Sequence, residues 1–130
     1  MSRKIVFDFY NVLYDRESRS ISEEVLNIVK DLKDMGEDLY LFTNSGKWFL
    51  EEKDRETPFL KYFTNVIACE NDCKKPSEEA FEKLLEIVGG KYEDILLIDD
   101  SEFNIEEAKK LGIMGERFVN ADSLRKVFGV

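Results

Sequence analysis

Short runs of apolar residues alternate along this chain with longer stretches in which apolar residues recur every three or four positions. The short runs predict buried β-strands at residues 5–7, 39–42, 66–69, 95–98 and 117–119. The longer stretches predict amphipathic helices at residues 20–35, 47–53, 77–88, 105–111 and 121–128. Ser20 and Ser77 are expected to cap the first and third of these helices. Strands that alternate with helices favour an α/β domain with a mainly parallel sheet and helices on both faces.

Three of the predicted strands end in polar residues that can carry chemistry. Asp8 follows the first strand, Thr43 the second and Asp99 the fourth. Ligands of parallel α/β sheets bind beyond the carboxyl ends of the strands, so we expect these side chains to share one edge. An aspartate at a strand end is also a common turn residue, and Asp8 taken alone has that ordinary interpretation. The set of residues, more than Asp8 itself, therefore predicts a functional site.

Composition narrows the functional classes. The chain of 130 residues, 43% of them hydrophobic, has the size of one domain spanning residues 1–130. It contains no histidine, which excludes a Ser-His-Asp triad and leaves acid–base chemistry to carboxylates, lysine or tyrosine. The net charge of −9 makes nucleic acid and anionic membrane surfaces poor partners.

The two cysteines and the N-terminus bear on location. Cys69 and Cys73 are too few and too close for a disulfide framework, and we expect them to be reduced. The first residues turn polar too soon for a signal peptide, and no apolar run is long enough to cross a membrane. A cytoplasmic location without a membrane partner is the prediction.

Four segments of the chain, in this order, resemble the motifs of the haloacid dehalogenase (HAD) superfamily. They read VFDFYNVLYD, LFTNSG, KKPSEEAFEKLLE and LLIDDSEFNIEEAKKLG. The resemblance implies a three-layer, doubly wound, Rossmann-like fold whose five strands lie in the order 3-2-1-4-5. It also implies a phosphatase that works through an aspartyl phosphate. No insertion between the motifs is long enough for a cap domain, so the chain resembles a capless member.

The resemblance assigns roles to the residues at the strand ends. Asp8 is expected to be the nucleophile and, through its second carboxylate oxygen, a ligand of Mg²⁺. Asp99 and the backbone carbonyl of Tyr10 are the other expected ligands. Hard oxygen donors are what Mg²⁺ prefers, and the cation lets an anionic nucleophile approach an anionic phosphate. Asp100 and Asn104 are expected to hold the metal ligand and its loop in place.

The remaining roles concern the phosphoryl group. Thr43 is expected to donate a hydrogen bond to it, and Lys75 to balance the charges of the phosphoryl group and the two carboxylates. Lys74 is the rival for the second role, but the lysine of the family directly precedes proline, as Lys75 does. The other residues expected to contact the substrate are Tyr10, Asn11 and Asn44.

Tyr10 departs from the family's phosphatases, which carry a second aspartate two residues after the nucleophile. A tyrosine is a poor general acid near neutral pH, so the expected phosphatase turns over weakly. A protein that binds phosphate or a protein partner without turnover is the alternative hypothesis. A 2-haloacid dehalogenase, which also carries tyrosine there, is a third and weaker one, because those enzymes use a cap.

A capless site is expected to be open. In the family, members with an open site act on phosphorylated macromolecules or form oligomers in which neighbouring subunits cover the site. A phosphorylated small molecule remains a candidate partner, whereas nucleic acid is disfavoured by the acidic composition.

Overall fold

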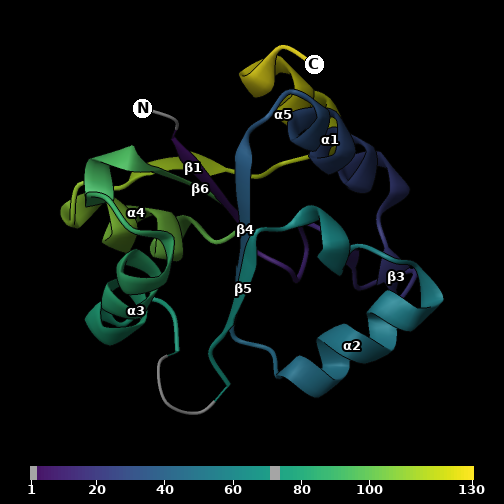
Figure 1. Cartoon of the computed structure of the whole chain (residues 1–130), viewed down its shortest axis with the longest axis horizontal. Helices are drawn as coiled ribbons and strands as arrows, with labels where there is room; N and C mark the ends of the chain where they lie inside the picture. The colour runs from purple at the N-terminus through teal and green to yellow at the C-terminus, as the bar shows by residue number, and fades with distance from the viewer. Residues whose placement is uncertain (1–2, 71–73) are drawn as a thin grey trace.

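The computed structural model describes residues 3–70 and 74–130, and a five-stranded sheet forms its centre (Figure 1). Neighbouring strands follow the order β5-β4-β1-β6-β7, and every pair is parallel. Their bounds are Lys4–Phe7 for β1, Asp38–Thr43 for β4, Asn65–Ala68 for β5, Ile95–Asp99 for β6 and Met114–Arg117 for β7. Numbered along the chain, this is the order 3-2-1-4-5, so the predicted topology is confirmed.

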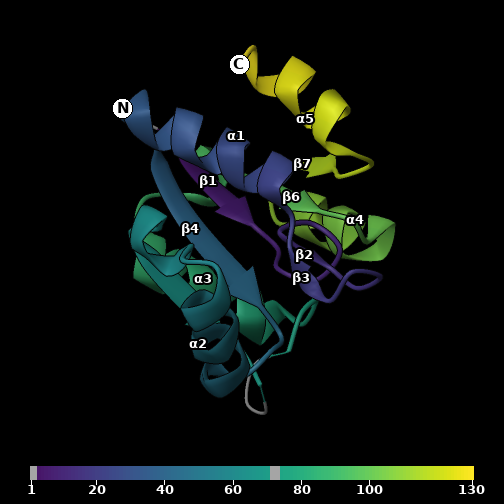
Figure 2. The same cartoon turned by 90° about the vertical axis from the view of Figure 1, so that its right-hand side faces the viewer.

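Helices cover both faces of the sheet (Figures 1 and 2). On one face lie α1 (Glu23–Asp34) and α5 (Ala121–Phe128), and on the other α3 (Glu78–Val88) and α4 (Glu102–Lys110). The helix α2 (Lys47–Glu56) follows β4 and adds Leu50 to the core beneath α1. Single 3₁₀ turns stand at Leu60–Tyr62 and Tyr92–Asp94. The three-layer, doubly wound architecture is as predicted.

Burial alternates along the central strands. In β1, Ile5 and Phe7 enter the core under α1 and α5, while Val6 enters the core under α3 and α4. β4 and β6 alternate in the same way. Because side chains of successive strand residues point to opposite faces, a strand buried on both faces reads as one continuous apolar run. This is why the strand predictions from short apolar runs were correct at the centre of the sheet.

A small β-hairpin occupies the segment between β1 and α1, which we predicted as a loop. Its strands are β2 (Tyr14–Asp15) and β3 (Ser20–Ile21), paired antiparallel. Ser20 therefore belongs to a strand, and its predicted role as helix cap is wrong. Ser22 caps α1 instead, its hydroxyl accepting a hydrogen bond from the Val25 amide at 3.3 Å. Two-residue strands are too short to show a period in the sequence.

The last strand also lies earlier than predicted, at Met114–Arg117 instead of 117–119. As an edge strand it pairs only with β6 and needs little apolar character. Gly115 lets α4 pack close to it, because a Cβ at that position would lie 2.7 Å from Ile105 Cγ2. The position of this edge strand is therefore associated with close packing against α4, which a search for apolar runs does not detect.

Two further expectations concern the cysteines and insertions. Cys69 is buried and disulfide-bonded, so the expected reduced state is wrong for this residue, while Cys73 lies outside the described residues. In the described part of the chain, only residues 8–22, which include the hairpin, separate β1 from α1, and three residues separate β4 from α2, so neither place holds a cap domain. Residues 3–70 and 74–130 contain no helix with the length and apolarity to cross a membrane.

Candidate active site

The carboxyl edge of the sheet gathers the polar residues that follow the strands. Asp8 stands one residue beyond β1, and its amide donates to the Ile98 carbonyl at 2.9 Å, which continues the β1–β6 ladder. Thr43 and Asp99 are the last residues of β4 and β6. All three are buried. Backbone hydrogen bonds of the sheet thus fix the Asp8 position independently of any ligand.

Lys75 joins the carboxylates. Its Nζ donates to Asp8 Oδ1 at 2.8 Å, to Asp99 Oδ2 at 3.0 Å and to the Phe42 carbonyl at 2.9 Å. Its side chain is only 2% exposed, whereas Lys74 is exposed. Of the two lysines that the sequence left in competition, Lys75 is the one in the site.

Asn44 holds Lys75 in this position. Its Oδ1 accepts from the Lys75 amide at 2.8 Å, and its Nδ2 donates to the Lys75 carbonyl at 3.3 Å. Both polar atoms of the Asn44 side chain are thus used in hydrogen bonds to the Lys75 backbone. Asn44 lines the cleft and its side chain positions the lysine, while the contact of its backbone with a phosphoryl group remains a prediction.

Thr43 lies beneath the surface of the site. Its hydroxyl accepts from the Ser45 amide at 3.1 Å and donates to Ser45 Oγ at 3.3 Å, and it is fully buried. Ser45, which the sequence analysis did not single out, lines the cleft in its place. The expected hydrogen bond from Thr43 to a phosphoryl group remains a prediction.

The environment of Asp8 raises the pKa of its carboxyl when no cation is present. Burial, the largest cause, raises the pKa of the Asp8 carboxyl to about 7; the ammonium of Lys75 opposes this, and the charge of Asp99 adds to it. Burial likewise raises the pKa of the Tyr10 hydroxyl, which the nearby charge of Arg16 partly offsets. A tyrosine with a raised pKa is a still weaker acid near neutral pH.

Asp99 and Asp100 are both held by hydrogen bonds. Asp99 Oδ1 accepts from the Ser101 amide at 3.0 Å, and Asp99 Oδ2 accepts from Asn104 Nδ2 at 3.2 Å as well as from Lys75. Asp100 Oδ2 accepts from Asn11 Nδ2 at 3.1 Å. Asn104 therefore contacts the expected metal ligand directly, and Asn11 reaches the site through Asp100.

The acidic residues meet the requirements of a hard cation. Asp8, Asp99 and Asp100 each offer one carboxylate oxygen, and these oxygens lie within 4.8 Å of one another. The donors are all oxygen and carry more negative charge than Lys75 neutralises, a combination that fits Mg²⁺. The Tyr10 carbonyl remains a predicted ligand.

These residues line a cleft of about 390 Å³. Besides the predicted residues, Arg16, Ser45 and Ser101 line it. Arg16 lies between the two strands of the hairpin, with its guanidinium carbon 4.8 Å from the centroid of the Tyr10 ring. No motif marks this arginine, because its place in the cleft depends on a hairpin that the sequence does not announce.

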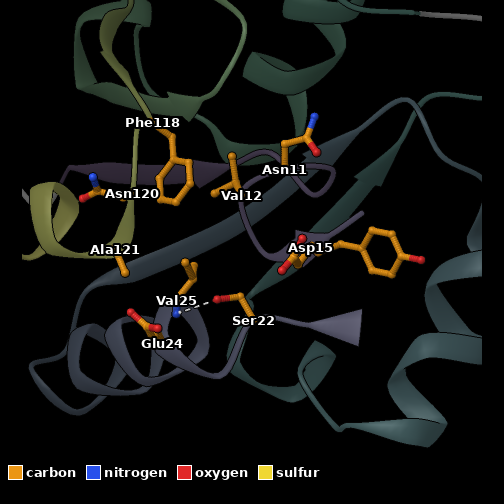
Figure 3. Close-up of a pocket in the computed structure, with 10 residues that line it drawn as sticks. Asn11, Val12, Asp15, Ser22, Glu24, Val25, Phe118, Asn120 and Ala121 are labelled. Atoms are coloured by element: carbon orange, nitrogen blue, oxygen red, sulfur yellow. Dashed lines mark hydrogen bonds between the residues drawn. The ribbon is translucent and has the colours of Figure 1, made fainter. Parts of the chain in front are cut away.

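A second cleft, of about 310 Å³, is also lined by Asn11 (Figure 3). It is bordered by the hairpin and by the first residues of α1 and α5. Its polar residues include Ser22, which caps α1, and Asn120, whose Oδ1 accepts from the Ser123 amide at 2.8 Å and caps α5. These two side chains already serve the helices, so we assign them a structural role.

The sequence and the fold agree with one family. Residues 4–115 match the haloacid dehalogenase-like hydrolases. The chain belongs to this family of hydrolases.

The match to an individual relative covers a smaller part of the chain. A flavin mononucleotide hydrolase of Arabidopsis thaliana is 30% identical over 91 residues, which cover 68% of this chain and 36% of that protein. The chain thus matches only about a third of the length of that relative.

Two solved structures illustrate the fold. A HAD family enzyme of Bacteroides thetaiotaomicron, solved with magnesium and inorganic phosphate, has a TM-score of 0.76 at 17% identity, covering 90% of this chain and 94% of the other. The L-2-haloacid dehalogenase of Xanthobacter autotrophicus has a TM-score of 0.80 at 12% identity, covering 99% and 83%. At these identities the likeness concerns the fold alone.

Proposed function

We propose that this chain is a Mg²⁺-dependent phosphatase that hydrolyses a phosphomonoester through transient phosphorylation of Asp8. The observation that carries the proposal is the bridge of Lys75 Nζ between Asp8 Oδ1 and Asp99 Oδ2, at the ends of neighbouring parallel strands. A buried cation between two carboxylates, with a third carboxylate nearby, suits a site that receives an anionic group and a divalent cation. The family membership and the Bacteroides neighbour with magnesium and phosphate support it.

In this mechanism an oxygen of Asp8 attacks phosphorus, and the bond from phosphorus to the leaving oxygen breaks with its electron pair on that oxygen. Water then attacks the phosphorus of phosphorylated Asp8, which releases phosphate and restores the carboxylate. Lys75 balances the charge of Asp8 and of the incoming phosphoryl group. Mg²⁺, held by Asp8, Asp99 and the Tyr10 carbonyl with the Asp100 carboxylate close by, would neutralise charge on the phosphoryl oxygens when bound.

The alternative, a protein that binds phosphate or a partner without turnover, is favoured by Tyr10. No carboxylate occupies that position, so a leaving alkoxide has no strong acid to protonate it and water has no evident base there. We regard dehalogenation as the least favoured function because the described chain has no cap to enclose a small haloacid.

Hydrolysis of 4-nitrophenyl phosphate, whose leaving group needs no proton, separates the first two functions. We expect turnover that requires Mg²⁺ and is inhibited by beryllium fluoride, which mimics a phosphorylated aspartate. Folded, magnesium-bound protein without turnover would contradict the phosphatase and leave the binding protein.

Replacing Tyr10 by aspartate is expected to raise turnover of alkyl phosphates by about a hundredfold, since general acid–base catalysis contributes at least that much. Turnover of 4-nitrophenyl phosphate should change much less, because its leaving group departs as an anion. The ratio of the two rates, measured for Tyr10→Asp and for Tyr10→Asn as the neutral control, checks the prediction. An equal gain in both variants would show that the carboxylate is not the cause.

The raised pKa of Asp8 predicts that Mg²⁺ binding depends on pH. The cation needs the ionised carboxylate, so below the pKa of about 7 its binding must release a proton from Asp8. Affinity should therefore rise by up to about tenfold per pH unit between about pH 5 and pH 7, and level off above that range. Calorimetry in buffers of different ionisation enthalpy counts the protons. Binding at pH 6 without proton release would contradict the prediction.

A further inference from the structure

Tyr10 lines the cleft and is packed among other aromatic rings. Its ring stacks on Phe49 with centroids 5.8 Å apart and meets the rings of Phe9 and Tyr14 edge-on at 5.4 and 5.7 Å. The Asn11 amide donates to the Tyr14 carbonyl at 2.8 Å, which ties the loop to the hairpin. A ring packed in this way offers a fixed platform two residues from Asp8.

Arg16 rests on this platform, and no described carboxylate pairs with its charge. Its guanidinium lies 4.8 Å from the Tyr10 ring centroid, and it forms no ion pair with any carboxylate of residues 3–70 or 74–130. Arg3, Arg117 and Arg125 each do form one. A cation–π contact with the face of an aromatic ring restrains a guanidinium without using its N–H donors, which stay available for another partner.

The two cationic side chains that line the cleft differ in burial and in hydrogen bonding. Lys75 donates to two carboxylates and a carbonyl, and is buried. Arg16 is exposed and lines the same cleft as Asp8. A guanidinium presents a planar pair of donors that matches a carboxylate or a phosphate group. Arg16 is therefore the cation of the described cleft that can receive an anion from solution.

We propose that Arg16, held on Tyr10, is a specificity-determining residue that binds a second anionic group on the leaving part of the substrate. The proposal rests on the phosphatase function, since the phosphoryl group itself is bound at Asp8 and Lys75. Tyr10 occupies the position where the family places the acid that faces the leaving oxygen, so its neighbour Arg16 is suited to meet the leaving part. The substrate class is a phosphomonoester that also carries a carboxylate or a second phosphate.

Non-hydrolysable ligands test the subsite directly. In the presence of Mg²⁺, the affinity of phenylphosphonate is compared by calorimetry with those of 3- and 4-phosphonobenzoate and of benzene-1,4-diphosphonate. We expect the wild type to bind at least one doubly anionic ligand about tenfold more tightly, since a charge-assisted pair contributes at least that much. Preference for phosphonobenzoate identifies a carboxylate as the second group, and preference for the diphosphonate identifies a phosphate.

Three variants give the controls. Arg16→Ala should bind all the ligands equally, and Arg16→Lys should keep part of the preference. Arg55→Ala removes the same charge from an exposed position on α2 and should bind as the wild type does. A preference that survives in Arg16→Ala, or a wild type without any preference, would overturn the proposal.

The same preparations separate this proposal from the phosphatase function. Turnover of 4-nitrophenyl phosphate without an Arg16-dependent preference rejects the subsite alone. An Arg16-dependent preference in a protein without turnover keeps the anion subsite and rejects hydrolysis.

Discussion

Asp8→Asn is expected to lower phosphatase turnover at least about a thousandfold, because it removes the nucleophile that the proposed mechanism requires. The amide keeps nearly the same shape and can still accept a hydrogen bond from Lys75. The loss should therefore appear in kcat for every substrate, including 4-nitrophenyl phosphate, and the phosphorylated form detected by mass spectrometry should disappear.

The same substitution should stabilise the protein when no divalent cation is present. Asp8 has a folded-state pKa of about 7, above the ordinary value of 3.8. Stability contributed by its protonated form is complete below about pH 4 and is lost as the pH rises through 7. The asparagine side chain of this variant never ionises, so above pH 7 the variant should be more stable by about 1–3 kcal/mol, a rise of several degrees in Tm.

Asp8→Asn is thus expected to lower turnover and to raise stability. These opposite effects distinguish the loss of the nucleophile from a loss of the folded state. Asp34→Asn makes the same chemical change at an exposed end of α1 and should leave both quantities unchanged. A variant that loses turnover because it unfolds would show a lower Tm. Retention of turnover in folded Asp8→Asn would contradict the mechanism.

Lys75→Met is expected to destabilise the protein by about 3–5 kcal/mol, because it leaves the Asp8 and Asp99 carboxylates buried without their shared cation. Methionine fills most of the lysine volume, so the loss reflects charge more than a cavity. Urea denaturation at pH 8 without divalent cations measures it. Turnover should fall as well, since in the proposed mechanism Lys75 also balances the charge of the phosphoryl group.

Two comparisons establish the cause of that loss. Lys74→Met, at the exposed neighbouring position, should change the unfolding free energy by less than about 0.5 kcal/mol. The double variant Asp8→Asn with Lys75→Met should be more stable than Lys75→Met alone, because one of the stranded charges is gone. Equal losses for the two lysine variants would show that the ion pairs in the structure contribute nothing measurable.

The sequence predicted the parts of the site that follow from strand ends. Asp8 and Asp99 come together because a parallel sheet aligns the carboxyl ends of its strands, and apolar runs locate those ends. Lys75 was placed by its neighbour Pro76 and by the family pattern, and in the structure it is Lys75, and not Lys74, that lies between the two carboxylates.

What the sequence did not predict depends on contacts between segments. The position of Arg16 follows from a hairpin with two-residue strands, which leave no periodic signal. The commitment of Asn44 to the Lys75 backbone joins residues 31 positions apart and requires the folded chain. The shift of β7 reflects the close packing of Gly115 on α4, which a search for apolar runs misses.

The alternating burial of the central strands divides the chain into positions with different evolutionary freedom. Residues such as Phe7 and Ile98 are fixed by packing, while Arg16 lines the cleft outside both cores. Substitutions at Arg16 should cost little in folding, so directed evolution of substrate choice should concentrate its libraries there. Lys75 is the exception, since it balances the charges of Asp8 and Asp99 in the folded state and, in the proposed mechanism, also in the reaction, so we expect a change of substrate to leave it in place.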